Sequence, residues 1–202
     1  MEKQIGGVIL IGGSSSRMGR DKAFLEVEGK TIIERIVEVF SANFSRVALV
    51  GSRPDRFASY SLPVHPDIYT GSALGGLYTG LYHAETPYAF VSSCDLPYPN
   101  SGVLRYLCSL REGYDAVVPS TPHGMEPLFA LYSKSCLPAI KALLDRGECC
   151  AYGYYPDIKV RHVLPAELAP FDLGGNAFIN VNTPEQYAAV ADTPQPPRGG
   201  RS

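Results

Sequence analysis

A loop rich in glycine and serine follows the first apolar run of the chain. The sequence VILIGGSSSRMGRDK occupies residues 8–22 and contains the cations Arg17 and Lys22. Glycines let backbone N–H groups approach phosphate oxygens, and the two cationic side chains can offset phosphate charge. A cluster of glycine and serine is also typical of an ordinary loop. Because this loop joins a strand pattern to a helix pattern, it favours a polyphosphate site.

An aspartate follows another apolar run, at residues 88–93, within the sequence VSSCDLP. Asp95 is held by the proline turn that follows it and could coordinate Mg²⁺ between phosphates, because carboxylate and phosphate oxygens suit this ion. An aspartate here could also be a turn residue or a helix N-cap. Together with a phosphate loop from a neighbouring strand, Asp95 favours a metal site.

Two further segments carry polar groups that could contact a ligand. Asp67 precedes the sequence GSALGG at residues 71–76, and this pair could bind a nucleobase or ribose, or form a turn and a closely packed helix start. Asn180 and Asn182 lie two apart on an extended segment, so their side chains are predicted to point the same way. They either bind a ligand or satisfy backbone groups ahead of a helix.

Two familiar phosphate motifs do not match. In a Walker A loop, Gly-Lys is followed by Ser or Thr, whereas here Gly19 precedes Arg20 and Lys22 precedes Ala23. The dinucleotide pattern G-x-G-x-x-G is absent from the first loop. The sequence therefore disfavours a P-loop NTPase and an NAD(P) dehydrogenase.

Composition narrows the class of protein further. The 202 residues are 45% apolar and 19% charged, which predicts a folded core. The net charge is −2 and no basic block occurs, so no nucleic-acid partner is expected. The five cysteines lack metal-ligand spacing and fit a reducing cytosol. No apolar run approaches the ~18 residues of a membrane span, and the N-terminus lacks a signal-peptide cleavage site, so we predict a cytoplasmic protein without a membrane partner.

Strand and helix patterns alternate along the chain. The sequence Thr31-Ile-Ile-Glu34 forms a capping box ahead of an amphipathic helix, and Thr183-Pro-Glu-Gln186 opens a last short helix. Strands are predicted at 5–11, 47–51, 62–65, 88–93, 115–119, 126–132 and 159–164, and helices at 32–42, 72–84, 101–110 and 134–145.

This alternation predicts an α/β fold: a single domain with a doubly wound, mainly parallel sheet. The domain should span residues 1–192, and the Pro- and Gly-rich residues 193–202 should form a disordered tail. In such a fold, ligands bind at the carboxyl ends of the strands. The first loop, Asp67 and Asp95 each follow a predicted strand, so we expect them to lie at one edge of the sheet.

Taken together, four ordered segments resemble the molybdenum cofactor guanylyltransferases, a family within the nucleotidyltransferase superfamily. The opening LIGGSSSRMGRDKAFLEVEGKTIIER is similar to the family pattern LAGGxSxRMGxDKxLLxxxGKxLLxR. The sequence HPD with SALGGLYTGL is similar to the family's Asp and GPLxGIxxGL. VSSCDLPY and FINVNTPEQY are similar to CDMPF and FxNxNTPEDL. The resemblance covers about residues 5–190.

The resemblance implies a Rossmann-like nucleotidyltransferase fold and a GTP-binding, Mg²⁺-dependent transferase. The implied reaction moves GMP from GTP to the terminal phosphate of molybdenum-loaded molybdopterin and releases pyrophosphate. GTP and molybdopterin are then the substrates, and molybdoenzymes or other proteins of cofactor biosynthesis are the implied partners.

The resemblance also assigns roles to residues of this sequence. Arg17, Lys22 and Asp95 are implied to be catalytic, with Asp95 also the metal ligand. Asn180 and Asn182 are implied to lie on the pterin, or acceptor, side. The residues implied to bind the nucleotide are Leu10, Ile11, Gly12, Gly13, Lys22, Asp67 and Asp95.

The sequence departs from the family pattern at three points, and two alternatives to this function stay open. Ile11 replaces the usual Ala, Ala73 the usual Pro, and a base-contacting Asn aligns near Val50 and Gly51. One alternative is a nucleotidyltransferase that uses CTP or a sugar-phosphate acceptor, although Leu10 and the following double glycine favour the guanine type. The other is a non-catalytic GTP-binding protein that delivers the cofactor.

Overall fold

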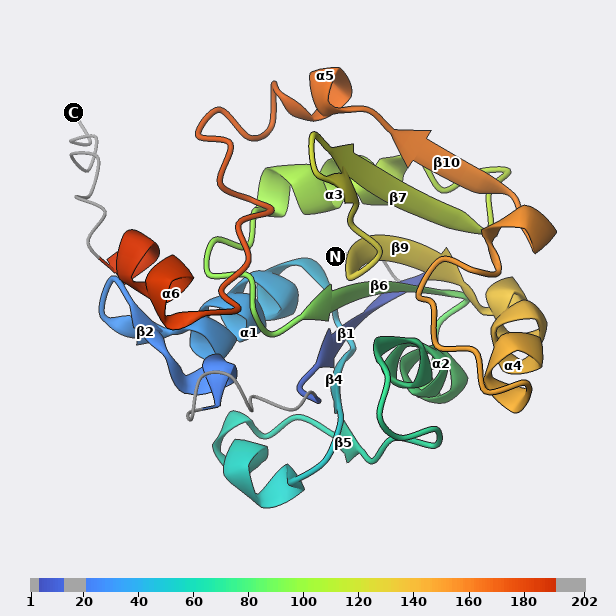
Figure 1. The fold of residues 1–202 in the computed structure, drawn as a ribbon, viewed down its shortest axis with the longest axis horizontal. Helices are drawn as coiled ribbons and strands as arrows, with labels where there is room; N and C mark the ends of the chain where they lie inside the picture. Colours follow the sequence, from blue (N-terminus) through green and yellow to red (C-terminus); the bar gives the residue numbers. More distant parts are fainter. Residues whose placement is uncertain (1–3, 13–20, 192–202) are drawn as a thin grey trace.

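The computed structural model describes residues 4–12 and 21–191. Gly13, Arg17 and the tail predicted at 193–202 lie outside the described residues. The strands are β1 (Ile5–Leu10), β2 (Glu26–Val27), β3 (Lys30–Thr31), β4 (Val47–Val50), β5 (Val64–His65), β6 (Tyr88–Ser93), β7 (Ala116–Thr121), β8 (Gly124–Met125), β9 (Phe129–Ser133) and β10 (Val160–Val163) (Figure 1). The helices are α1 (Ile32–Asn43), α2 (Ala73–His83), α3 (Ser101–Ser109), α4 (Leu137–Asp145), α5 (Pro165–Leu168) and α6 (Pro184–Ala191).

The main sheet has the strand order β10-β7-β9-β6-β1-β4-β5, and β8 pairs with β7. β1 pairs in parallel with both β4 and β6, whereas β9 runs antiparallel to β6 and β7. All residues of β1 are buried, as expected for a central strand that is covered on both faces. The predicted doubly wound, mainly parallel α/β fold is confirmed.

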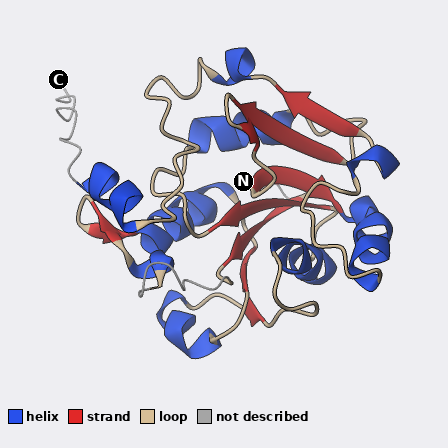
Figure 2. Cartoon of the chain, in the orientation of Figure 1, coloured by secondary structure: helices blue, strands red, loops and turns tan. Residues whose placement is uncertain are grey.

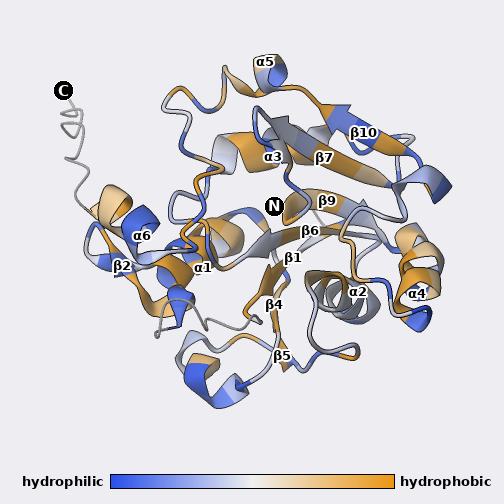
Figure 3. Cartoon of the chain, viewed as in Figure 1, coloured by the Kyte–Doolittle hydropathy of each residue, from blue (hydrophilic) through white to orange (hydrophobic). Residues whose placement is uncertain are grey.

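Helices cover both faces of this sheet (Figures 1 and 2). On one face, Ile5 and Ile9 pack in a core cluster with α1 and α3; on the other, Val8 and Leu10 pack in a cluster with α2 and α4. This alternation along β1 follows from the two-residue repeat of a strand. Figure 3 colours much of β4 and α4 as hydrophobic, in agreement with their burial.

Several predicted elements are confirmed nearly to the residue. The strand at 88–93 is β6, and α1 begins after the predicted capping box, in which the Thr31 N–H donates to the Glu34 carboxylate at 2.7 Å. At the last helix, the Gln186 N–H donates to the Thr183 hydroxyl at 3.3 Å, as the capping pattern predicted. Local capping chemistry therefore fixes these helix starts.

Other predicted bounds were wrong. The strand predicted at 126–132 begins only at Phe129, because Pro127 has no N–H to donate and residues 124–125 pair instead with the end of β7. The β2–β3 hairpin was missed; it turns through Glu28 and Gly29, which have φ angles of 53° and 76°. Helix α5 was also missed.

No helix within residues 4–12 and 21–191 has the length and apolar content needed to cross a bilayer. The cytoplasmic location stays a prediction.

Candidate active site

The carboxyl ends of β1, β4 and β6 meet at one edge of the sheet. The Ile11 N–H donates to the Val50 carbonyl at 2.8 Å, and the Cys94 N–H donates to the Leu10 carbonyl at 3.2 Å. From β1 the chain continues to β4 and β5 on one side of the sheet, and it then returns to β6 on the other side of β1. The strand order therefore reverses at β1. In doubly wound sheets a crevice forms at this point.

A cavity of about 610 Å³, which we call the β1 cavity, opens at this edge. The described residues predicted to bind the nucleotide all line it: Leu10, Ile11, Gly12, Lys22, Asp67 and Asp95. The rest of the lining consists of residues at the start of α2 and of Asp21, Val50, Ser52, Arg53, Ser93 and Leu128. Segments far apart in the sequence are thus brought together, as the strand-end argument predicted.

Close backbone packing forms the wall of the β1 cavity beside β4. Gly51 has a φ of 147°, and a Cβ atom there would lie 2.7 Å from the Gly12 nitrogen, so this turn requires glycine. The Asp67 carboxylate lies between Gly12 and Gly76. If these glycines carried Cβ atoms, the atoms would lie 3.4 Å and 3.6 Å from the Asp67 oxygens. Burial raises the pKa of Asp67. A half-buried carboxylate is therefore presented at the end of β5.

The start of α2 is fixed beside Asp67. The Ser72 hydroxyl caps the helix by accepting from the Gly75 N–H at 3.1 Å. A Cβ on Gly75 would lie 1.9 Å from the Tyr69 carbonyl oxygen, so only glycine allows this approach. The first turn of α2 lines the β1 cavity, and the partial positive charge of a helix N-terminus favours a bound anion there.

Asp95 is held at the end of β6 from two directions. The Ser93 hydroxyl donates to its carboxylate at 2.5 Å, and its backbone carbonyl accepts from the Val181 N–H at 2.9 Å. The adjacent Cys94 thiol has its pKa raised to about 12 by burial and by the charge of Asp95, so it stays protonated. The Asp95 carboxylate is the group that this strand end offers to a ligand.

Lys22 contacts a residue from the far end of the chain. Its Nζ donates to Asn182 Oδ1 at 2.6 Å, and the Asn182 N–H in turn donates to the Gln186 side chain at 2.7 Å. The neighbouring Asp21 pairs with Arg56 at 2.7 Å. Residues 21 and 22 are thus held by Asn182, just ahead of α6, and by Arg56 of residues 54–60, and Lys22 lines the β1 cavity.

A second cavity, of about 760 Å³, opens beside α6, and we call it the α6 cavity. Asn180 lines it, whereas Asn182 contacts Lys22 in the β1 cavity, so residues 180–182 run between the two. The apolar part of its lining includes Tyr98, Pro122, Leu168, Phe178, Ile179 and Val190. Roles for Asn180 and Asn182 in binding an acceptor stay predictions.

Two lining residues were not singled out from the sequence. Arg53 lines the β1 cavity with a φ of 66°, a left-handed conformation that side chains other than glycine rarely adopt. It stands two residues after the strand predicted at 47–51 and directly before Pro54, a position that could have identified it. Glu126 lines the α6 cavity, but no motif marked it.

The donor set suits a cation shared with a ligand. Within the described residues, no group of three or more His, Cys, Asp or Glu side chains is placed to hold a metal ion. Asp95 nevertheless supplies a hard oxygen ligand in the β1 cavity, and Mg²⁺ in nucleotide sites commonly takes one or two carboxylates with substrate phosphates. The residues present therefore fit Mg²⁺ bound together with a polyphosphate.

Known proteins match most of the chain. The model of the MobA-like NTP transferase domain matches residues 7–157. A probable molybdenum cofactor guanylyltransferase of Pelotomaculum thermopropionicum is 35% identical over 199 residues, which cover 98% of this chain and 97% of that protein. The chain is a nucleotidyltransferase of the molybdenum cofactor guanylyltransferase family. A second family member, from Desulfosudis oleivorans, is 32% identical and is covered to 91% of its length, with 89% of this chain aligned.

Solved structures share the fold of this chain. The molybdopterin-guanine dinucleotide biosynthesis protein A of Archaeoglobus fulgidus superposes with a TM-score of 0.81 at 23% identity, over 92% of this chain and 96% of that chain. A putative protein of Aquifex aeolicus has a TM-score of 0.73 at 30% identity, over 89% of this chain and 94% of that one. The fold of this guanylyltransferase-family chain is therefore the nucleotidyltransferase fold.

Proposed function

We propose that the protein transfers GMP from GTP to the terminal phosphate of molybdopterin that carries molybdenum, forming the guanine dinucleotide cofactor and pyrophosphate. The observation that carries the proposal is that residues 180–182 connect two cavities: Asn180 lines the apolar α6 cavity, and Asn182 contacts Lys22, which lines the β1 cavity together with Asp95. The names of the relatives, molybdenum cofactor guanylyltransferases, favour a guanine nucleotide and the molybdenum cofactor as the substrates. We propose that this reaction takes place in the cytoplasm.

GTP would occupy the β1 cavity. The backbone of Leu10, Ile11 and Gly12 would line the nucleoside, and Asp67 would accept hydrogen bonds from it. The first turn of α2 and the Lys22 ammonium would offset phosphate charge. Gly13 and Arg17, on the same loop of the sequence, are proposed to complete the phosphate contacts.

Asp95 would hold Mg²⁺ against the phosphates. The ion would supply positive charge that neutralises the phosphoryl oxygens and orients them for in-line attack. The hydrogen bond from Ser93 fixes one Asp95 oxygen, and the backbone contact with Val181 fixes the strand end. The protein then acts mainly by positioning its substrates. The phosphate oxygen of molybdopterin and the α-phosphorus of GTP must lie about 3–3.5 Å apart before the transfer.

Molybdopterin would enter from the α6 cavity, with its phosphate directed past Asn180 toward the α-phosphorus of GTP. The apolar lining suits a ring system, and Asn180 adds a polar side chain to the same lining. As pyrophosphate leaves, the Lys22 ammonium stabilises its growing charge. The product is expected to pass to a molybdoenzyme or to another protein of cofactor biosynthesis.

A nucleotide panel tests the proposal. GTP, CTP and ATP are each incubated with molybdopterin and Mg²⁺, and both dinucleotide and pyrophosphate are measured. Guanine dinucleotide formed from GTP at a rate well above the other two supports the proposal. Preference for CTP, transfer to sugar 1-phosphates instead of molybdopterin, or GTP binding without pyrophosphate release with any acceptor would each refute it.

A further inference from the structure

Two carboxylates line the α6 cavity, those of Asp172 and Glu126, and their hydrogen bonds differ. The carboxylate of Asp172 accepts from the N–H groups of Asn176 at 3.2 Å and Ala177 at 3.1 Å, so both of its oxygens serve the fold of its own loop. The carboxylate of Glu126 accepts at Oε1 from the Thr121 hydroxyl at 3.4 Å, a long contact. Within the described ranges, Oε2 of Glu126 receives no protein hydrogen bond.

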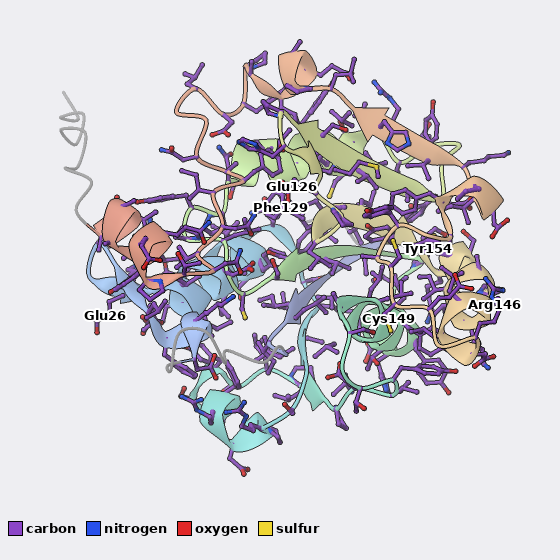
Figure 4. All side chains as sticks on the ribbon, viewed as in Figure 1. Glu26, Glu126, Phe129, Arg146, Cys149 and Tyr154 are labelled. Carbon is purple, nitrogen blue, oxygen red and sulfur yellow. The ribbon has the colours of Figure 1, made fainter. Side chains whose placement is uncertain are left out.

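The backbone of Glu126 is nevertheless firmly placed. Its N–H donates to the Pro119 carbonyl at 2.9 Å, and its own carbonyl accepts from the Phe129 N–H at 3.2 Å. It therefore stands between the β7–β8 hairpin and the start of β9. Figure 4 shows Glu126 close to Phe129, far from the group of Arg146, Cys149 and Tyr154 beside α4. The backbone of Glu126 is therefore fixed, while its Oε2 atom is available to a ligand in the α6 cavity.

The surroundings of Glu126 indicate what that ligand must offer. Burial raises the pKa of its carboxyl, and the charge of Asp95 adds to the rise, whereas the nearby His123 lowers it. A second anion would be repelled here, so the acceptor's phosphate does not fit beside this carboxylate. A neutral ring with two adjacent N–H donors on one edge does fit, because a carboxylate accepts two parallel hydrogen bonds.

We propose that Glu126 is the specificity-determining residue of the α6 cavity and binds the edge of the acceptor's pterin ring that carries the 2-amino group and the adjacent ring N–H. This inference rests on the proposed function, since it assigns the α6 cavity to molybdopterin. The pterin ring then packs against the apolar residues Phe178 and Ile179, while the phosphate extends toward Asn180. The nucleotide site in the β1 cavity does not depend on Glu126.

The substitution Glu126→Gln tests this pairing with little change in shape. Two probes compete with molybdopterin in the transfer assay: 6-hydroxymethylpterin monophosphate, and the matching lumazine, in which oxygen replaces the 2-amino group. The wild-type protein should bind the pterin roughly 10- to 100-fold more tightly than the lumazine, because a hydrogen bond to a charged group is lost in the lumazine complex.

Glu126→Gln should reverse this preference. A glutamine amide accepts from the ring N–H and donates to the lumazine oxygen, so it matches the lumazine edge and mismatches the pterin edge. The KM for molybdopterin should rise roughly 10-fold or more, while the KM for GTP and the Mg²⁺ requirement stay unchanged. Glu148→Gln, an exposed carboxylate paired with Arg146 at 2.7 Å, is the matched control and should keep the wild-type preference.

An unchanged pterin-to-lumazine ratio in Glu126→Gln would overturn the inference. So would a raised KM for GTP or a raised Mg²⁺ requirement, because Glu126 would then serve the nucleotide or the metal. Equal binding of the pterin and the lumazine by the wild-type protein would also overturn the inference. Failure of the proposed function is distinguishable, since the wild-type protein would then form no guanine dinucleotide from molybdopterin at all.

Discussion

Removing the Lys22 ammonium group is the most direct test of the nucleotide site. Lys22 is half-buried in the β1 cavity and is held by the 2.6 Å hydrogen bond to Asn182. A unit charge about 4 Å from a phosphate oxygen contributes about 4 kcal/mol at an effective dielectric constant of about 20. Partial exposure lowers this figure, so Lys22→Ala should lose about 3 to 4 kcal/mol of transition-state stabilisation. This corresponds to a fall in kcat of roughly 10²- to 10³-fold.

The assay follows pyrophosphate and dinucleotide formation from GTP and molybdopterin under saturating conditions. Asn182→Ala should lower kcat about 10-fold, since one hydrogen bond to a charged group contributes on the order of 1.5 kcal/mol. If Asn182 acts by placing Lys22, the double variant should be no slower than Lys22→Ala alone. Lys141→Ala, which breaks a surface pair with Asp145 on α4, is the control and should turn over normally. Normal turnover by Lys22→Ala would refute the reasoning.

Three further predictions concern the metal ligand, the β4 turn and a histidine pair. Asp95→Asn should lower kcat by at least 10²-fold and raise the Mg²⁺ concentration needed for half-maximal activity; an unchanged Mg²⁺ titration would contradict the assigned role. Gly51→Ala should lower the free energy of unfolding by about 1 to 3 kcal/mol in urea denaturation and weaken GTP binding, because its Cβ would meet the Gly12 backbone. His65 stacks on His83 at 4.1 Å between ring centroids, and burial, followed by the His83 charge, lowers the pKa of His65 from 6.5. As the pH falls below about 6.5, the unfolded chain therefore binds more protons than the folded protein, and the free energy of unfolding decreases. His65→Asn should make this decrease smaller. Equal urea midpoints from pH 7.5 to 5.5 in the wild-type protein would contradict this prediction.

Much of the site was predictable because its parts follow strands. Asp67 and Asp95 each stand just after an apolar run, and the carboxyl ends of parallel strands meet at one edge, so their convergence did not need the structure. The capping box at Thr31 likewise fixed the start of α1 through contacts three residues apart. Local chemistry and the regularity of the fold account for these successes.

The remaining features depend on contacts that no local pattern encodes. An apolar run such as that of β9 indicates a buried strand but not its direction, so its antiparallel place between β6 and β7 was not predicted. The Lys22–Asn182 hydrogen bond joins residues 160 positions apart. Glu126 is a single carboxylate without a motif, and only the surrounding cavity gives it a role.

The contact of residues 180–182 with Asp95 and Lys22 has a consequence for biosynthesis of the enzyme. On a ribosome, β1, β4 and β6 emerge long before this segment, so the sheet can begin to form while Lys22 still lacks its partner Asn182. A nascent chain is therefore expected to be inert toward the two substrates until nearly its whole length has been translated. Protease cleavage ahead of residue 178 would likewise separate Asn182 from Lys22. This segment therefore matters for activity although it lies beyond residue 157, where the match to the domain family ends.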